Sequence, residues 1–157
     1  MNNMNAIGLN IETSKNLANS LNDLLANFQL YYQNLRSFHW NIKGEKFFEL
    51  HTKFEELYTL ANLHIDELAE RVLTLGFKPL SSFSEYLQYS EIKEASTIEQ
   101  ANEIILNLLT SLNILLVKER NALLISNEAN DEGTNALLSS YIVEHEKLVW
   151  MLTAYNR

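Results

Sequence analysis

Two pairs of potential metal ligands are spaced four residues apart in one stretch of the chain. His51 and Glu55 form the first pair, and Asp66 and Glu70 form the second. Residues at positions i and i+4 lie one above the other on a helix, so each pair can chelate one ion. Imidazole and carboxylate ligands suit iron, zinc or manganese. Because the sequence contains no cysteine, a thiolate site is excluded.

The distance between the two pairs predicts that a second chain completes each site. Asp66 follows His51 by fifteen residues, which is roughly 22 Å along a straight helix. One helix cannot bring its own two pairs together. A second copy that runs antiparallel across a two-fold axis can place its second pair opposite the first pair of its partner.

His39 is a fifth candidate ligand, at the expected end of the preceding helix. A tight turn at Gly44 returns the chain, so His39 can approach His51. One chain would then supply both histidines and Glu55, its partner would supply the other two acids, and two sites would form in each dimer.

The candidate ligands of the second helix share their face with Phe48 and Leu73. A face that mixes aromatic, aliphatic and acidic residues suits contact with another subunit. A divalent cation would offset the cost of burying three carboxylates there. The competing interpretation is that the acids form an ordinary solvated helix face.

The elements that must position these residues are four apolar-periodic stretches. They cover about residues 13–40, 45–75, 97–130 and 131 to the end, and each matches the period of an amphipathic helix. Short connections join the first to the second and the third to the fourth, so we expect two antiparallel hairpins.

The long connection, residues 76–96, is too long to be structureless in a compact domain. Phe83 and Tyr86 give it enough apolar surface for a short helix, and Ser96 with Glu99 predicts a capping box that opens the third long helix. The predicted fold class is therefore all-α, a ferritin-like four-helix bundle with a short helix in its long crossover.

The histidine spacing argues against a di-iron centre inside the bundle. Full-length ferritins and related bundles use Glu-x-x-His motifs for that purpose, and none of the four histidines here has a glutamate three residues before it. We expect His64 to be a packed core residue and His145 to be either packed or exposed, with neither acting as a ligand.

Composition limits the class of protein. The chain has 157 residues, 46% of them hydrophobic, one proline and four glycines, as expected for a single helical domain over residues 1–157. Residues 1–12 form a short, non-basic N-terminal extension. No apolar run approaches the roughly 18 to 20 residues of a membrane span, and no signal peptide is apparent. We therefore expect a cytoplasmic protein.

Three segments resemble the Dps family, the miniferritins of the ferritin-like superfamily. They are residues 39–44 (HWNIKG), 47–51 (FFELH) and 66–71 (DELAER), and the similarity extends from about residue 13 to the end. The resemblance implies a hollow homododecamer with ferroxidase centres at its two-fold interfaces. It also implies oxidation of Fe(II), preferably by hydrogen peroxide, and storage of the ferric mineral.

The resemblance implies the same ligands that the spacing predicts. These are His39, His51, Glu55, Asp66 and Glu70. The family often has aspartate where this chain has Glu55, and the longer arm can change how tightly a second iron is held. The sequence leaves three alternatives open. They are one or two irons per centre, peroxide or oxygen as the oxidant, and iron, zinc or manganese as the metal in the cell.

Other family features map onto this chain less specifically. Trp40 is either an electron donor near the site or a core aromatic. Glu128, Asp131 and Glu132 are candidate acids of an iron-entry pore, although Asp131 is equally interpreted as a helix cap.

Two competing functions are a DNA-protecting structural protein and a plain helical interaction module. Dps proteins that condense DNA commonly do so through lysine-rich tails, but residues 1–14 contain no Lys or Arg, and the net charge is −8. We therefore expect no appreciable DNA binding.

Overall fold

The computed structural model describes residues 3–95 and 97–157. In these residues it contains five α-helices and no strand, so the all-α prediction is confirmed. The helices are α1 (Ile11–Asn41), α2 (Phe47–Thr74), α3 (Phe83–Tyr89), α4 (Ala101–Glu128) and α5 (Glu132–Tyr155).

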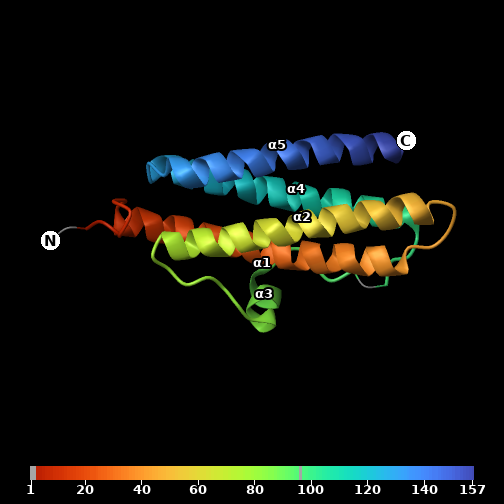
Figure 1. Cartoon of the computed structure of the whole chain (residues 1–157), viewed down its shortest axis with the longest axis horizontal. Helices are drawn as coiled ribbons and strands as arrows, with labels where there is room; N and C mark the ends of the chain where they lie inside the picture. The colour runs from red at the N-terminus through yellow and green to blue at the C-terminus, as the bar shows by residue number, and fades with distance from the viewer. Residues whose placement is uncertain (1–2, 96) are drawn as a thin grey trace.

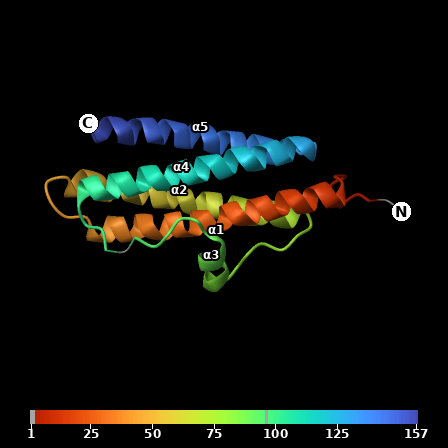
Figure 2. The same cartoon turned by 180° about the vertical axis from the view of Figure 1, so that it is seen from behind.

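The four long helices pack as two antiparallel hairpins. Helices α1 and α2 form one hairpin, and α4 and α5 form the other, which lies against it (Figure 1). The crossover from α2 to α4 runs the length of the bundle along α1, and it carries α3 on the outside (Figure 2). This is the ferritin-like arrangement that the sequence predicts.

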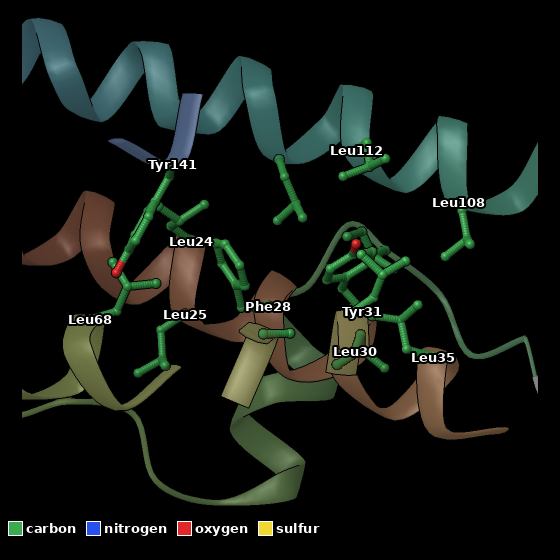
Figure 3. Close-up of a cluster of buried hydrophobic side chains, with 14 of the residues drawn as sticks. Leu24, Leu25, Phe28, Leu30, Tyr31, Leu35, Leu68, Leu108, Leu112 and Tyr141 are labelled. Atoms are coloured by element: carbon green, nitrogen blue, oxygen red, sulfur yellow. The ribbon is translucent and has the colours of Figure 1, made fainter. Parts of the chain in front are cut away.

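Helix α1 is central to the core because it packs against α2, α3 and α4. All of its predicted core residues are buried, namely Leu17, Leu21, Leu24, Phe28, Tyr31, Leu35 and Phe38. The close-up view shows Phe28 among Leu24, Tyr31 and Tyr141 of α5 (Figure 3). The Phe28 ring centroid lies 5.9 Å from that of Tyr141. Burial of one such side chain stabilises the fold by about 1.5–3 kcal/mol.

Three asparagines of α1 hold the crossover in place. Asn27 accepts hydrogen bonds at Oδ1 from the backbone N–H groups of Glu91 and Ile92. The side-chain amide of Asn34 donates to the carbonyl of Lys93 at 2.8 Å, and its Oδ1 accepts from a backbone N–H two residues further along the crossover. Near the start of the crossover, Asn22 likewise donates to one backbone carbonyl and accepts from one backbone N–H. Polar residues on α1 therefore satisfy backbone groups that have no sheet or helix partner.

The start of α4 differs from the prediction. Ser96 lies outside the described residues, and α4 begins at Ala101 instead of residue 97, after the N-cap residue Gln100, which makes no side-chain cap bond. Glu99 is engaged elsewhere, because its carboxylate lies 2.8 Å from Nζ of Lys43 and its carbonyl accepts from the Lys43 N–H. Glu99, the second residue of the predicted capping box, therefore contacts the α1–α2 loop.

Helix α4 also corrects the expectation about membrane spans. Among the described helices it alone is long and apolar enough to cross a membrane by length and composition, with a mean hydropathy of 1.3 over 18 residues. Residues 104–117 include amides and hydroxyls but no charged residue. Ile105, Leu108 and Leu112 of this helix are buried in the bundle, and a core helix meets the same criterion.

Candidate metal centre

His39 and His51 come together where the α1–α2 hairpin turns, as the sequence predicts. Their ring centroids are 3.7 Å apart and their planes differ by 13°. Nδ1 of His39 lies 2.6 Å from the carbonyl oxygen of His51, and Nδ1 of His51 lies 2.6 Å from the carbonyl oxygen of His39. A carbonyl only accepts, so each Nδ1 donates a proton, and in the neutral form of each ring the lone pair lies on Nε2. This is the orientation that second-shell carbonyls impose on metal-binding histidines.

Local packing fixes both imidazole rings. Gly44 adopts a φ of +102° in the loop, a conformation that glycine tolerates best. The ring of Phe47 stacks on His51 with centroids 5.0 Å apart, and the ring of Tyr58 meets His39 edge-on at 5.3 Å. The two imidazole rings are therefore held in place by aromatic neighbours.

The three predicted carboxylate ligands all lie on α2 and are exposed. Glu55 lies one turn after His51 on the same helix. Asp66 and Glu70 lie much further along it, and because α2 runs from Phe47 to Thr74 as one element, Asp66 is roughly 22 Å from His51 along the helix axis. The chain thus brings His39 and His51 together with Glu55 nearby, which we call the hairpin cluster. It does not bring the second pair of acids to them.

Large apolar side chains surround these exposed acids. Phe48 is 84% exposed, Leu73 57% and Leu63 52%. Trp40 is 56% exposed, with the Arg36 guanidinium 4.9 Å from its ring, so it is not a core aromatic of this chain. Exposed apolar residues next to exposed acids are typical of a surface that another subunit covers.

The three candidate pore acids separate into two kinds. Asp131 is 3% exposed, caps α5 by accepting from the Thr134 N–H, and pairs with Arg71 at 2.6 Å. The helix-cap interpretation is therefore confirmed for this residue. Glu128 and Glu132 are exposed at the same turn.

A second histidine–carboxylate cluster lies inside the bundle. Nε2 of His64 is 3.3 Å from Oε2 of Glu144, and Nδ1 of His145 is 2.7 Å from Oε1 of Glu119. His64 and His145 are both buried, as expected for His64, and Glu119 is fully buried. We call these four residues the core cluster. Sequence reasoning missed it, although His64, Glu119 and His145 each occupy a core-facing position of a different helix.

Burial dominates the electrostatics of the core cluster. It lowers the pKa of His64 to about 4, with a smaller contribution from the neighbouring His145. Burial also raises the pKa of Glu144; the nearby His145 opposes this shift, while Glu119 and Glu67 add to it. The phenol of Tyr141 donates to Glu67 at 2.6 Å. The centre of the bundle therefore holds several carboxylates close to two histidines.

The chain is similar to known ferritin-like proteins over most of its length. A family model described as a ferritin-like domain matches residues 18–157. An uncharacterized protein of Haemophilus influenzae is 50% identical over 95% of this chain and 93% of its own length. A DNA protection during starvation protein of Porphyromonas gingivalis is 43% identical over 94% of this chain and 93% of its own length.

A solved structure agrees with these sequence matches. It is the crystal structure of a Dps protein from Vibrio cholerae O1, described as a member of a broad superfamily of ferritin-like diiron-carboxylate proteins. It is 51% identical to this chain, superimposes with a TM-score of 0.97, and covers 100% of this chain and 98% of its own.

Proposed function

The chain belongs to the Dps family of ferritin-like proteins, and from that premise we propose that it oxidises Fe(II) and stores the ferric product. Iron storage and protection is the general function that membership supports. The observation that carries the specific proposal is the hairpin cluster. Its two imidazoles are held by reciprocal backbone bonds through Nδ1, which leave Nε2 of each ring outside these bonds, and its nearby carboxylate, Glu55, is exposed.

The proposed centre is shared between two chains. His39, His51 and Glu55 come from one chain, and Asp66 and Glu70 come from its partner across a two-fold axis. Such an interface is self-complementary, so each dimer holds two equivalent centres. The exposed Phe48 and Leu73 on the same helix supply apolar surface for that contact, and the wider assembly is a dodecameric shell.

The proposed reaction uses Fe(II) as substrate and hydrogen peroxide as the preferred oxidant. Two Fe(II) ions each give one electron, and peroxide takes up both electrons and two protons to form two molecules of water. This route does not release hydroxyl radical. Two imidazoles and three carboxylates are borderline-to-hard donors, which bind Fe(II) and favour Fe(III). The protein's part is to hold these donors in place, and Glu128 and Glu132 are candidates for guiding iron inward. We place this activity in the cytoplasm.

Subunit mixing tests whether the centre is shared. His51→Ala removes a ligand from one half of the centre and Asp66→Ala removes one from the other half, so each variant alone should be inactive. After the two variants are dissociated, mixed and reassembled, every mixed dimer contains one intact centre and one doubly damaged centre. Random mixing should therefore restore about a quarter of the parental rate of peroxide-dependent Fe(II) oxidation.

The control for subunit mixing is Glu146→Ala, which changes an exposed acid of α5 and should retain the parental rate. If mixing restores no activity while native mass measurements show mixed assemblies, the centre is not shared between chains. If the two single variants oxidise iron at the parental rate, these residues are not the ligands.

Protection through DNA binding is the second candidate function, and the charge of the chain disfavours it. The net charge is −8 and the first basic residue is Lys15. Phosphate neutralisation by Lys and Arg supplies most non-specific affinity for DNA. We infer that protection by this protein acts through iron removal. A gel-shift assay at low salt should show free DNA, and a tight complex there would contradict the inference.

A further inference from the structure

We propose that His64, Glu144 and His145 bind one zinc-class divalent metal ion inside each chain, separately from the shared iron centre. The site joins α2, which carries His64, to α5, which carries the other two ligands. It requires no second subunit, and it does not rest on the proposed iron oxidation.

The donor atoms are already close to coordination geometry. One donor atom of each of the three residues lies within 4.8 Å of the other two. Oε2 of Glu144 is 3.3 Å from Nε2 of His64 and 3.9 Å from Nε2 of His145. Donors bound tetrahedrally at about 2.0–2.1 Å are roughly 3.3 Å apart, so only small side-chain shifts are needed to enclose an ion.

Glu119 orients one of the ligands. Its Oε1 lies 2.7 Å from Nδ1 of His145, so a proton on Nδ1 leaves the lone pair on Nε2, which is the nitrogen that faces Glu144. A carboxylate behind a histidine is the usual second-shell support of a metal-binding imidazole. Glu119 comes from α4 and is fully buried, so it has no role at the protein surface.

The charges of the core cluster also point to a cation. In the part of the chain that the structure describes, Glu119 and Glu144 form ion pairs only with histidines. Oε2 of Glu119 and Nδ1 of His64 are buried there without a hydrogen-bond partner. A buried carboxylate is costly unless a positive charge compensates it. A divalent ion held against Glu144 and His145 would supply that charge.

A pocket gives the ion access to the cluster. It has a volume of about 250 Å³, and its lining includes His64, Glu144 and His145 together with Lys147. Lys147 is exposed and Glu144 is partly exposed, so the pocket connects the buried donors to solvent. An entry path is one of the requirements for a metal site.

The donor set favours zinc over the other common ions. Magnesium and calcium prefer oxygen donors, whereas two imidazoles with one carboxylate and one open position are a known zinc arrangement. Because the ligands come from α2 and α5, a bound ion should also cross-link the two hairpins and raise thermal stability.

Cobalt(II) is a suitable probe because its visible absorption reports coordination number. The titration uses the assembled His51→Ala, Asp66→Ala protein, in which the shared centre is disabled. We expect one cobalt per chain with intense, tetrahedral-type absorption that zinc displaces. Glu144→Gln, which keeps the size of the side chain, should weaken binding at least about tenfold. The matched control Glu146→Gln on the same helix should leave the affinity unchanged.

Two results of the cobalt titration would overturn the proposal. One is the absence of tetrahedral cobalt absorption in the variant with the disabled centre, and the other is equal cobalt affinity in the Glu144→Gln and Glu146→Gln proteins. Anomalous scattering from zinc in crystals of the parent protein gives a test that needs no variant. A peak between Nε2 of His64 and Oε2 of Glu144 is expected, and peaks only at the protein surface would contradict the site.

Discussion

The hairpin cluster and the core cluster use the same residue types but differ in what orients and completes them. In the hairpin cluster, backbone carbonyls orient both imidazoles, and the carboxylates on α2 are exposed and largely distant. In the core cluster, a buried carboxylate orients one imidazole, and three helices of one chain supply every member. The comparison teaches that exposed, separated candidate ligands need a second chain to form one site, whereas buried candidates on neighbouring helices already lie together.

The largest expected effect is on iron oxidation, and it comes from the hairpin cluster. The His51→Ala, Asp66→Ala double variant should lose more than about 100-fold of the rate, because each centre loses one ligand from each chain. The far-UV circular dichroism should stay that of a folded bundle, since His51 is only partly buried and Asp66 is exposed. A parental rate from this folded variant would show that His51 and Asp66 are not part of the iron-oxidising centre.

The core cluster should instead control stability at low pH. Burial lowers the pKa of His64 from 6.5 to about 4. Between pH 6.5 and about 4, His64 is therefore protonated in the unfolded chain but not in the folded chain. Stability is fully present above pH 6.5, is lost as the pH falls towards 4, and changes little from this source below that. The loss from His64 alone is on the order of 3 kcal/mol.

Neighbouring groups modify this pH dependence. The titratable groups near His64 on the other helices include Tyr31 from α1, Glu119 from α4, and Tyr141, Glu144, His145 and Lys147 from α5. The raised pKa of Glu144 acts in the opposite sense and offsets part of the loss. Urea unfolding with a metal chelator at pH 7.5, 5.5 and 4.5 measures the effect. A His64→Gln protein with the same pH profile as the parent would show that His64 is not its source.

The smallest expected effect sharpens the comparison most. His145→Gln damages the core cluster but leaves the hairpin cluster untouched, so the rate of peroxide-dependent Fe(II) oxidation should stay within about twofold of the parent. The same variant should lose the stabilisation by zinc, measured as the shift of the melting temperature. A large loss of oxidation in a correctly assembled His145→Gln protein would mean that the two clusters act together.

The sequence predicts the hairpin cluster better than the core cluster for a physical reason. Ligands spaced by four residues are visible along one helix, and Gly44 indicates the turn that returns His39 to His51. The core cluster depends instead on how three helices are aligned along the bundle. No spacing within one element reveals that His64, Glu119 and His145 lie at the same level. The reciprocal carbonyl bonds of His39 and His51 likewise require coordinates.

Helix boundaries show the same division. The core positions of α1 follow from apolar periodicity alone and are all buried. The start of α4 differs from the predicted one, and there Glu99 pairs with Lys43 of the α1–α2 loop, a contact between residues far apart in the sequence. Local signals thus predict the helices and their buried faces, while contacts between distant segments have no local signal in the sequence.

Because three asparagines hold the crossover, its backbone position depends little on which side chains it carries. Asn22, Asn27 and Asn34 bind main-chain atoms of the crossover, which are the same whatever side chains the crossover carries. Residues of the outer surface near α3 can therefore be substituted without loss of these bonds between α1 and the crossover backbone. Substitutions on this outer surface can therefore alter its contacts without disturbing the packed interior that supports both clusters.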